Sequence, residues 1–161
     1  CINKFFLFLS FFLSSKVFLE VTNSFNITAL DVESMIALQH QFYFTGQTRS
    51  AELLSDMLTK LRDAILANEY AVSYALQKDL GKSPFESYVT EIGFVLSSIS
   101  HMIKNVEAWM KPKAAKTPIH LQPSKSFIVR EPYGSVLIIA PFNYPFQLVM
   151  EPLVGAIVGG N

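Results

Sequence analysis

One stretch decides the fold: Glu131-Pro-Tyr-Gly-Ser-Val-Leu-Ile-Ile-Ala-Pro-Phe-Asn-Tyr-Pro-Phe146. Its Pro-Tyr-Gly opening is typical of a reverse turn. The apolar run Ser135–Ala140 has no polar face, which is typical of a strand buried in a parallel sheet. Pro141 cannot donate to a strand ladder and therefore ends it, and Pro145 suits the start of a helix. The order strand, loop, helix is half of a βαβ unit.

Asn143 stands in the loop between the predicted strand and the predicted helix. In open α/β sheets, ligands bind at the carboxyl ends of the strands. A neutral amide donor there can stabilise an oxyanion, contributing about 2.7–4 kcal/mol to a transition state. The same side chain could instead cap the helix that Pro145 begins. The spacing of the residues leaves both roles open.

Residues 31–110 are predicted to be helical because apolar side chains recur at three- and four-residue steps. We expect helices over about 31–44, with Asp31 as N-cap, then from about Arg49, again from about Asn68 to Leu80, and finally from Ser83 to about Met110. Ser83-Pro-Phe-Glu86 has the residues of a capping box, with proline at the first helical position. The apolar stripes are interpreted as core-facing or helix-pairing residues and not as a cofactor-binding motif.

Residues 111–131 are predicted to be a proline-rich linker and ribbon, in which Ile119–Leu121 and Ser126–Glu131 form strands. Residues 132–161 then supply the strand and helix of the deciding stretch. Because Pro152 would interrupt a helix, we expect a turn first and a helix over about 151–158. Gly159-Gly160 supplies its C-cap.

Residues 1–30 are interpreted as a hydrophobic leader outside the fold. The apolar run from Lys4 to Leu13 is shorter than the about 20 residues that span a bilayer and has the length of a signal-peptide core. Asn26-Ile-Thr28 is a glycosylation sequon only if the chain is secreted. A true start downstream (Met35 is one candidate), a genuine signal or anchor, and a buried helix all stay open. Because the chain begins with Cys1 and stops inside a βα unit, we expect a fragment.

Composition excludes several classes of site. Thirteen basic and thirteen acidic residues cancel, so charge favours neither nucleic acid nor an anionic membrane as a partner. Cys1 is the only cysteine, which excludes an internal disulfide. His40, His101 and His120 are far apart and lack ligand partners at metal spacing, so we predict surface or satisfied histidines and no metal.

The deciding stretch, continued by Glu151-Pro-Leu-Val-Gly-Ala-Ile-Val-Gly-Gly-Asn161, resembles the first cofactor-domain strand and helix of the aldehyde dehydrogenase superfamily. Four further motifs resemble its class 3 and fatty aldehyde dehydrogenase group: Phe44-Thr-Gly-Gln-Thr-Arg49, Ala75-Leu-Gln-Lys-Asp-Leu-Gly-Lys82, Glu91-Ile92 and Trp109-Met-Lys-Pro112. The resemblance covers about residues 32–161. It implies an α/β fold class: an amino-terminal helical layer plus the first strand and helix of a Rossmann-like cofactor domain, which is an incomplete aldehyde dehydrogenase fold.

The resemblance also implies a chemistry. The family oxidises aldehydes to carboxylic acids with NAD or NADP, through a cysteine thiohemiacetal. Asn143 matches the family's asparagine that helps hold the substrate oxygen. The family residues that line the cofactor pocket correspond in this chain to Ile139, Ala140, Pro141 and Phe142. Many relatives have Trp in place of Phe142. The nucleophilic cysteine and the general-base glutamate lie beyond Asn161 in the family, so the fragment alone is expected to be inactive.

The implied partners are an aliphatic or aromatic aldehyde as substrate and a second copy of the full protein in a homodimer, with no nucleic acid. The implied location is the cytoplasm, unless residues 1–30 form a genuine leader to a membrane or to the outside of the cell. Two other functions stay open. One is an acylating semialdehyde dehydrogenase of the same superfamily, and the other is a non-catalytic helical module, if the chain ends at Asn161.

Overall fold

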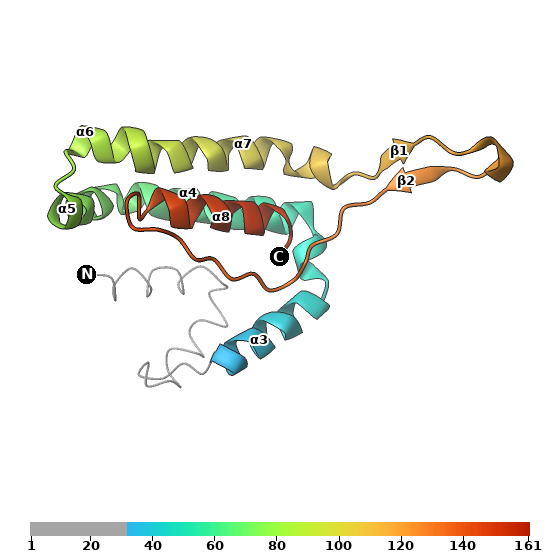
Figure 1. Cartoon of the computed structure of the whole chain (residues 1–161), viewed down its shortest axis with the longest axis horizontal. Coiled ribbons are helices and arrows are strands. Elements are labelled where there is room, and N and C mark those ends of the chain that lie inside the picture. The colour runs from blue at the N-terminus through green and yellow to red at the C-terminus, as the bar shows by residue number, and fades with distance from the viewer. Residues whose placement is uncertain (1–31) are drawn as a thin grey trace.

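The computed structural model describes residues 32–161 of the chain. The predicted leader, its sequon and the predicted N-cap Asp31 lie outside the described residues. Figure 1 shows long helices lying side by side, a two-stranded ribbon that projects from one end of them, and a further helix set at an angle below.

The core lies between three helices: α4 (Ala51–Ala67), α7 (Gly93–Met110) and α8 (Gln147–Val158). Each of the three contacts the other two, although the ribbon separates α8 from the others in sequence. Apolar side chains at helical spacing fill the space between them, which confirms most of the predicted stripes as core. The interpretation is wrong for Leu66, Tyr70, Leu80 and Val89, whose side chains are exposed. The buried cluster contains Leu58, Leu61, Ile65, Val72, Leu76, Ile92, Val95, Leu96, Ile99, Phe146, Met150 and Val154.

The first predicted helix is α3 (Val32–Phe44), but its apolar side is not part of the core. Met35, Ile36 and Leu38 are all exposed, because little of this face is covered by the described residues. The carboxyl end of α3 is anchored to the rest of the chain through Tyr43, whose hydroxyl donates to the carbonyl of Pro132 at 3.0 Å. A short 3₁₀ turn, η1 (Gln47–Arg49), then leads into α4.

The helix starts and ends follow local signals in the sequence. Ser50 caps α4 by accepting a hydrogen bond from the Leu53 amide at 3.2 Å, so α4 begins just after the predicted position. Gly81 ends α5 (Glu69–Leu80) with φ 70°, a left-handed conformation that favours glycine. Ser83 then accepts from the Glu86 amide at 3.1 Å, which confirms the predicted N-cap.

The long helix predicted after Ser83 is confirmed with one irregularity. The α6 turn (Pro84–Ser87) continues into a π-helical turn, η2 (Tyr88–Ile92), and then into α7. A π-helical turn is wider than an α-helical one and is frequent at functional sites. This one carries Glu91, whose side chain is fully buried.

The predicted ribbon is present, but one of its strands lies elsewhere. Strand β1 (Lys113–Ala115) pairs antiparallel with β2 (Ser126–Ile128), with Lys113 opposite Ile128. Ile119–Leu121, predicted as a strand, instead forms a 3₁₀ turn, η3, at the ribbon tip. The restricted backbone of Pro118, which precedes η3, favours a turn there, and the Leu121 amide donates to the Pro118 carbonyl at 3.0 Å.

Ser135–Ala140 does not form the predicted strand. Figure 1 shows the segment running back beneath the helices towards the start of α8. A strand requires a neighbour that pairs with its backbone groups, and the described residues place their two paired strands in the ribbon. Val136, Leu137 and Ile139 are consequently exposed. The segment has the composition of a buried strand without the neighbours that would bury it.

Helix α8 runs without a break through Pro152, which corrects the predicted start near Glu151. A proline in a helix interior costs about 3 kcal/mol. Phe146, Met150 and Val154 recur at four-residue spacing and are essentially fully buried. Burying such side chains contributes about 1.5–3 kcal/mol each, which offsets the cost of the proline.

A Schellman motif closes the carboxyl end of α8, as Gly159-Gly160 predicted. The Asn161 amide donates to the Ala156 carbonyl at 3.1 Å, and Gly160 is left-handed with φ 81°. The Asn161 side-chain oxygen accepts from the amides of Tyr133 and Gly134 at 2.6 and 3.1 Å. The end of α8 thereby holds the turn that precedes the exposed segment.

Replacing Gly160 with alanine should lower the free energy of unfolding by about 1–3 kcal/mol, because a left-handed non-glycine residue is strained. A Cβ at Gly160 would also lie 2.8 Å from the Thr48 carbonyl. Gly81→Ala is the matched control, since its φ is similar and a Cβ there meets no atom within 4 Å. Urea unfolding measures both variants. Equal losses would show that the close approach to Thr48 contributes nothing.

Candidate active site

Two charged side chains are buried against each other near the amino-terminal end of α8. Lys82 Nζ lies 2.5 Å from Glu91 Oε1, and the two side chains are 9% and 0% exposed. A buried charge is costly unless it is paired and its remaining hydrogen-bonding capacity is used. Both side chains therefore require further partners, and residues 143–147 supply them.

The second carboxylate oxygen of Glu91 caps α8. Glu91 Oε2 accepts from the backbone amides of Phe146 and Gln147 at 2.8 and 3.2 Å. Amides in the first turn of a helix have no partner within the helix, and the helix dipole favours a negative charge there. A residue of the π-helical turn thus supplies the cap of a helix that follows much later in the chain.

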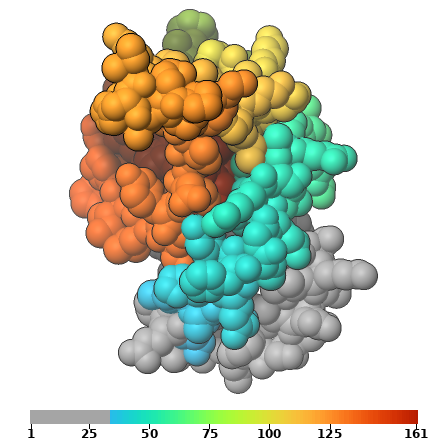
Figure 2. Space-filling model, turned by 90° about the vertical axis from the view of Figure 1, so that its right-hand side faces the viewer, coloured from blue at the N-terminus to red at the C-terminus, as the bar shows by residue number. Residues whose placement is uncertain are grey.

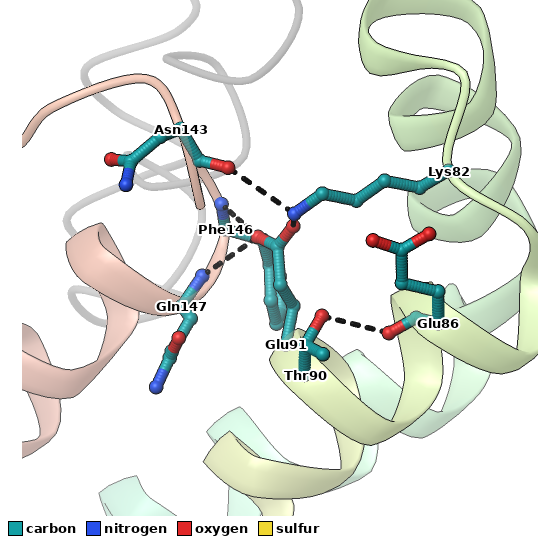
Figure 3. A network of polar contacts seen from close by, with 7 residues as sticks. All are labelled: Lys82, Glu86, Thr90, Glu91, Asn143, Phe146 and Gln147. Carbon is teal, nitrogen blue, oxygen red and sulfur yellow. Dashed lines mark hydrogen bonds and ion pairs between the residues drawn. The ribbon is translucent and has the colours of Figure 1, made fainter.

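Lys82 contacts the loop directly before α8. Its ammonium donates to the backbone carbonyl of Asn143 at 3.2 Å and lies 3.9 Å from the centroid of the Tyr144 ring, a cation–π distance. Figure 3 shows the Lys82 side chain reaching across to this loop beside Glu91. The Lys82–Glu91 pair therefore joins the turn before α6 and the π-helical turn to residues 143–147.

The Asn143 side chain takes no part in this network. Figure 3 shows its amide directed away from Lys82 and Glu91. Asn143 is exposed, and within residues 32–161 its side chain makes no hydrogen bond to another residue. Because Glu91 occupies the amides at the start of α8, the structure does not support the alternative that Asn143 caps that helix.

The four predicted cofactor residues lie immediately before Asn143. Ile139 and Phe142 are both 85% exposed, and Pro141 is exposed between them. These side chains fit an apolar wall against which the rings of a dinucleotide can pack. The four residues carry no charged side chain for its phosphates.

A surface hollow lies at the other end of α8. Figure 2 shows it between the base of the ribbon and α4, with the red end of α8 at its floor. Its lining includes Thr48, Leu54, Trp109, Arg130 and Val158. None of the predicted site residues lines it, so it is separate from the network around Asn143.

Other kinds of site are not seen in the described part of the chain. No group of three or more His, Cys, Asp or Glu side chains there is placed to hold a metal ion. His40, His101 and His120 are exposed, in agreement with the predicted surface positions. Among residues 32–161, no helix combines the length and apolar character that a bilayer crossing requires.

The sequence profile of the aldehyde dehydrogenase family matches residues 17–161. The chain belongs to the aldehyde dehydrogenase family. Membership confirms the resemblance seen in the sequence, including its class 3 character, because family 3 members are among the relatives. In the mouse (Mus musculus), aldehyde dehydrogenase family 3 member B3 is 42% identical over 117 residues, which are 73% of this chain and 24% of the relative.

Bacterial aldehyde dehydrogenases are similar as well. The 4,4'-diaponeurosporen-aldehyde dehydrogenase of Staphylococcus aureus is 52% identical over 120 residues, which are 74% of this chain and 26% of that protein. A solved structure of Staphylococcus aureus AldH in its substrate-bound state matches with a TM-score of 0.79 and 47% identity. That match covers 83% of this chain and 29% of the other. The chain thus spans about a quarter of its relatives' length, and its structure agrees with an incomplete aldehyde dehydrogenase fold.

Sequence reasoning did not assign a role to Lys82 or Glu91, which appeared only inside motifs of the resemblance. One signal was present: Glu91 lies directly before Ile92 and four residues before Val95, both of which face the core. A carboxylate among core-facing residues requires a buried partner. Which partner it has depends on α8 and the loop before it, far along the chain.

Glu91→Gln should destabilise the full-length protein by about 3–5 kcal/mol, because it leaves the Lys82 ammonium buried without a counter-charge. Adding Lys82→Met should recover part of the loss, since the pair is then neutral. Urea unfolding of the two single variants and the double variant gives the coupling between them. The control is the exposed pair Asp56 and Lys60, whose side chains are 49% and 69% exposed. If the stability losses of the two single variants add up to the loss of the double variant, the two side chains are not coupled.

A partly buried carboxylate, that of Glu151, lies on α8. Ser98 donates to Glu151 Oε2 at 2.9 Å, while the other oxygen of Glu151 is buried without a partner in the described residues. Burial raises the pKa of Glu151 above its ordinary value of 4.5, although the Ser98 hydrogen bond partly opposes the rise. Glu151 is therefore more easily protonated in the folded protein than in the unfolded chain.

Glu151→Gln should raise the unfolding midpoint at neutral pH. Because the folded pKa is raised, the stability from protonated Glu151 is present below its unfolded pKa and is lost as pH rises through the folded value. The neutral glutamine avoids that loss, so the difference from wild type should shrink as pH falls to about 4. Thermal unfolding across this pH range checks it. A difference that does not change with pH would rule out Glu151 ionisation as the cause.

Proposed function

We propose that this chain is the amino-terminal part of an NAD(P)-dependent aldehyde dehydrogenase that oxidises aldehydes to carboxylic acids through a cysteine thiohemiacetal. The family match and the names of the relatives support this reaction class. In this proposal, the nucleophilic cysteine and the general-base glutamate lie beyond Asn161. The residues described here supply substrate positioning and part of the cofactor surface, and alone they are not expected to turn over.

The observation that carries the proposal is the free amide of Asn143. Glu91 takes the helix-capping role that Asn143 could otherwise fill, and Lys82 holds the Asn143 backbone carbonyl. The side-chain amide is left exposed at the position that matches the family's asparagine. A donor held in this way can bond to the substrate oxygen as negative charge develops on it, without changing its own charge.

Ile139, Ala140, Pro141 and Phe142 are proposed to pack against the dinucleotide. When bound, a nicotinamide dinucleotide supplies the hydride acceptor for aldehyde oxidation. The four side chains would cover the flat faces of its rings and exclude water from the loop that carries Asn143. The exposure of Ile139, Pro141 and Phe142 in the described residues is consistent with a surface that a ligand and the rest of the family fold would cover.

The proposed substrates are aliphatic or aromatic aldehydes. The proposed full protein is a homodimer in the cytoplasm, to which the exposed β1–β2 ribbon contributes contacts. The family match disfavours a non-catalytic helical module. A free module would also expose the apolar side chains of Leu137, Ile139 and Phe142 together to water.

Asn143→Ala in the full-length enzyme should lower kcat about 10²–10³-fold, as expected for loss of one oxyanion donor. The dissociation constant of NAD(P) and the unfolding midpoint should stay near wild type, because the exposed amide stabilises neither. Steady-state kinetics with a simple aldehyde, cofactor titration and thermal unfolding measure the three quantities.

Gln147→Ala is the matched control, since it removes a nearby amide side chain whose backbone, rather than its side chain, bonds to Glu91. It should leave kcat within about twofold of wild type. Unchanged kcat in Asn143→Ala, combined with a lower unfolding midpoint, would assign Asn143 a structural role and reject the proposed one.

A further inference from the structure

We propose that Lys82 is a positioning residue for Asn143, holding the asparagine backbone so that its amide points at the substrate oxygen. This inference rests on the proposed oxyanion role of Asn143. It assigns a function to a buried cation whose burial would otherwise be an unexplained cost.

The contact is made with Asn143 itself. Lys82 Nζ donates to the carbonyl oxygen of Asn143 at 3.2 Å, so it fixes the peptide plane that follows the asparagine Cα. The same ammonium lies over the ring of Tyr144. Two neighbouring loop residues are thus held from one point, while the Asn143 side chain stays clear of the network (Figure 3).

Glu91 holds the Lys82 side chain in place. Its carboxylate holds the ammonium at 2.5 Å and also holds the first amides of α8. The loop is therefore anchored on both sides of Tyr144: at the Asn143 carbonyl by Lys82, and at Phe146 and Gln147 by Glu91. Asn143 itself lies in an irregular bend, with no helix or strand to hold it.

The catalytic value of this anchoring follows from geometry. An oxyanion donor is effective only when it lies about 2.7–3.1 Å from the position that the charged oxygen will occupy. A displacement of about 1 Å can lower a rate about 10²-fold. Without the Lys82 contact, the Asn143 amide would sample several directions, and kcat would fall even though the amide is still present.

The test is a kinetic double-mutant cycle in the full-length enzyme. Its first component is Lys82→Met with Glu91→Gln, which removes the anchor of Asn143 and leaves no unpaired buried charge. Its second component is Asn143→Ala. Alone, the paired variant should lower kcat about 10–100-fold and should change the dissociation constant of NAD(P) less than about twofold. In the Asn143→Ala background it should change kcat less than about twofold, because no amide remains to be positioned.

The outcomes separate the possible roles of Lys82. If the paired variant lowers kcat by the same factor with and without the Asn143 side chain, Lys82 acts through general stability or through its own charge, and the inference is overturned. Unchanged kcat in the paired variant also overturns it. If Asn143→Ala leaves kcat unchanged, the oxyanion role itself fails, and the positioning role fails with it.

A second cycle covers the case in which the paired variant does not fold. Lys82→Arg keeps a cation beside Glu91 but replaces the compact ammonium with a planar group of different reach. It should lower kcat less than the paired replacement, and this loss should again disappear in Asn143→Ala. Unchanged kcat, or a loss that persists without the amide, counts against positioning. Asp56→Asn with Lys60→Met, which removes an exposed ion pair, is the control and should leave kcat unchanged.

Discussion

The carboxylate of Glu91 joins segments of the chain that the ribbon separates in sequence. One of its oxygens pairs with Lys82, and the other accepts from the first amides of α8. Because the carboxylate is fully buried, each of these bonds is made where water cannot replace it. The position of α8 on the helical layer, and of the loop before it, therefore depends on this group as well as on apolar packing.

The network explains how an irregular loop can present a side chain in a defined direction. Helices α4, α7 and α8 form a packed layer. The Lys82–Glu91 pair connects this layer to residues 143–147. Asn143 is held by its backbone and not by its side chain. The group that the loop presents is consequently free to bond to a ligand, which is the arrangement that an oxyanion donor needs.

The exposed segment before Asn143 lacks the neighbours that its apolar side chains require. Ser135–Ala140 and Phe142 carry the apolar side chains of a covered strand, and the Asn161 contacts fix the turn at which the segment begins. Within residues 32–161, no second strand lies beside it. Its composition therefore fits a surface that the rest of the family fold and a cofactor would cover. The chain spans only about a quarter of the length of its relatives, so most of that fold lies outside the matched region.

The sequence by itself determined the local features of this protein. Helix spacing identified most of the buried residues of α4 and α7. Gly81 and Ser83 marked a helix end and a helix start, and Gly159-Gly160 marked the last cap. The motifs around Asn143 identified the family. These features were readable because each depends on residues within a few positions of one another.

Only the tertiary structure decided the features that join distant residues. Pro152 remains inside α8 because the buried face of that helix packs against α4 and α7, and this packing outweighs a local signal. Ser135–Ala140 is not a strand because strand formation depends on a neighbour as well as on composition. Glu91 replaces Asn143 as the cap of α8 because the folded chain places its carboxylate at two amides 55 and 56 residues away. No local pattern encodes that contact.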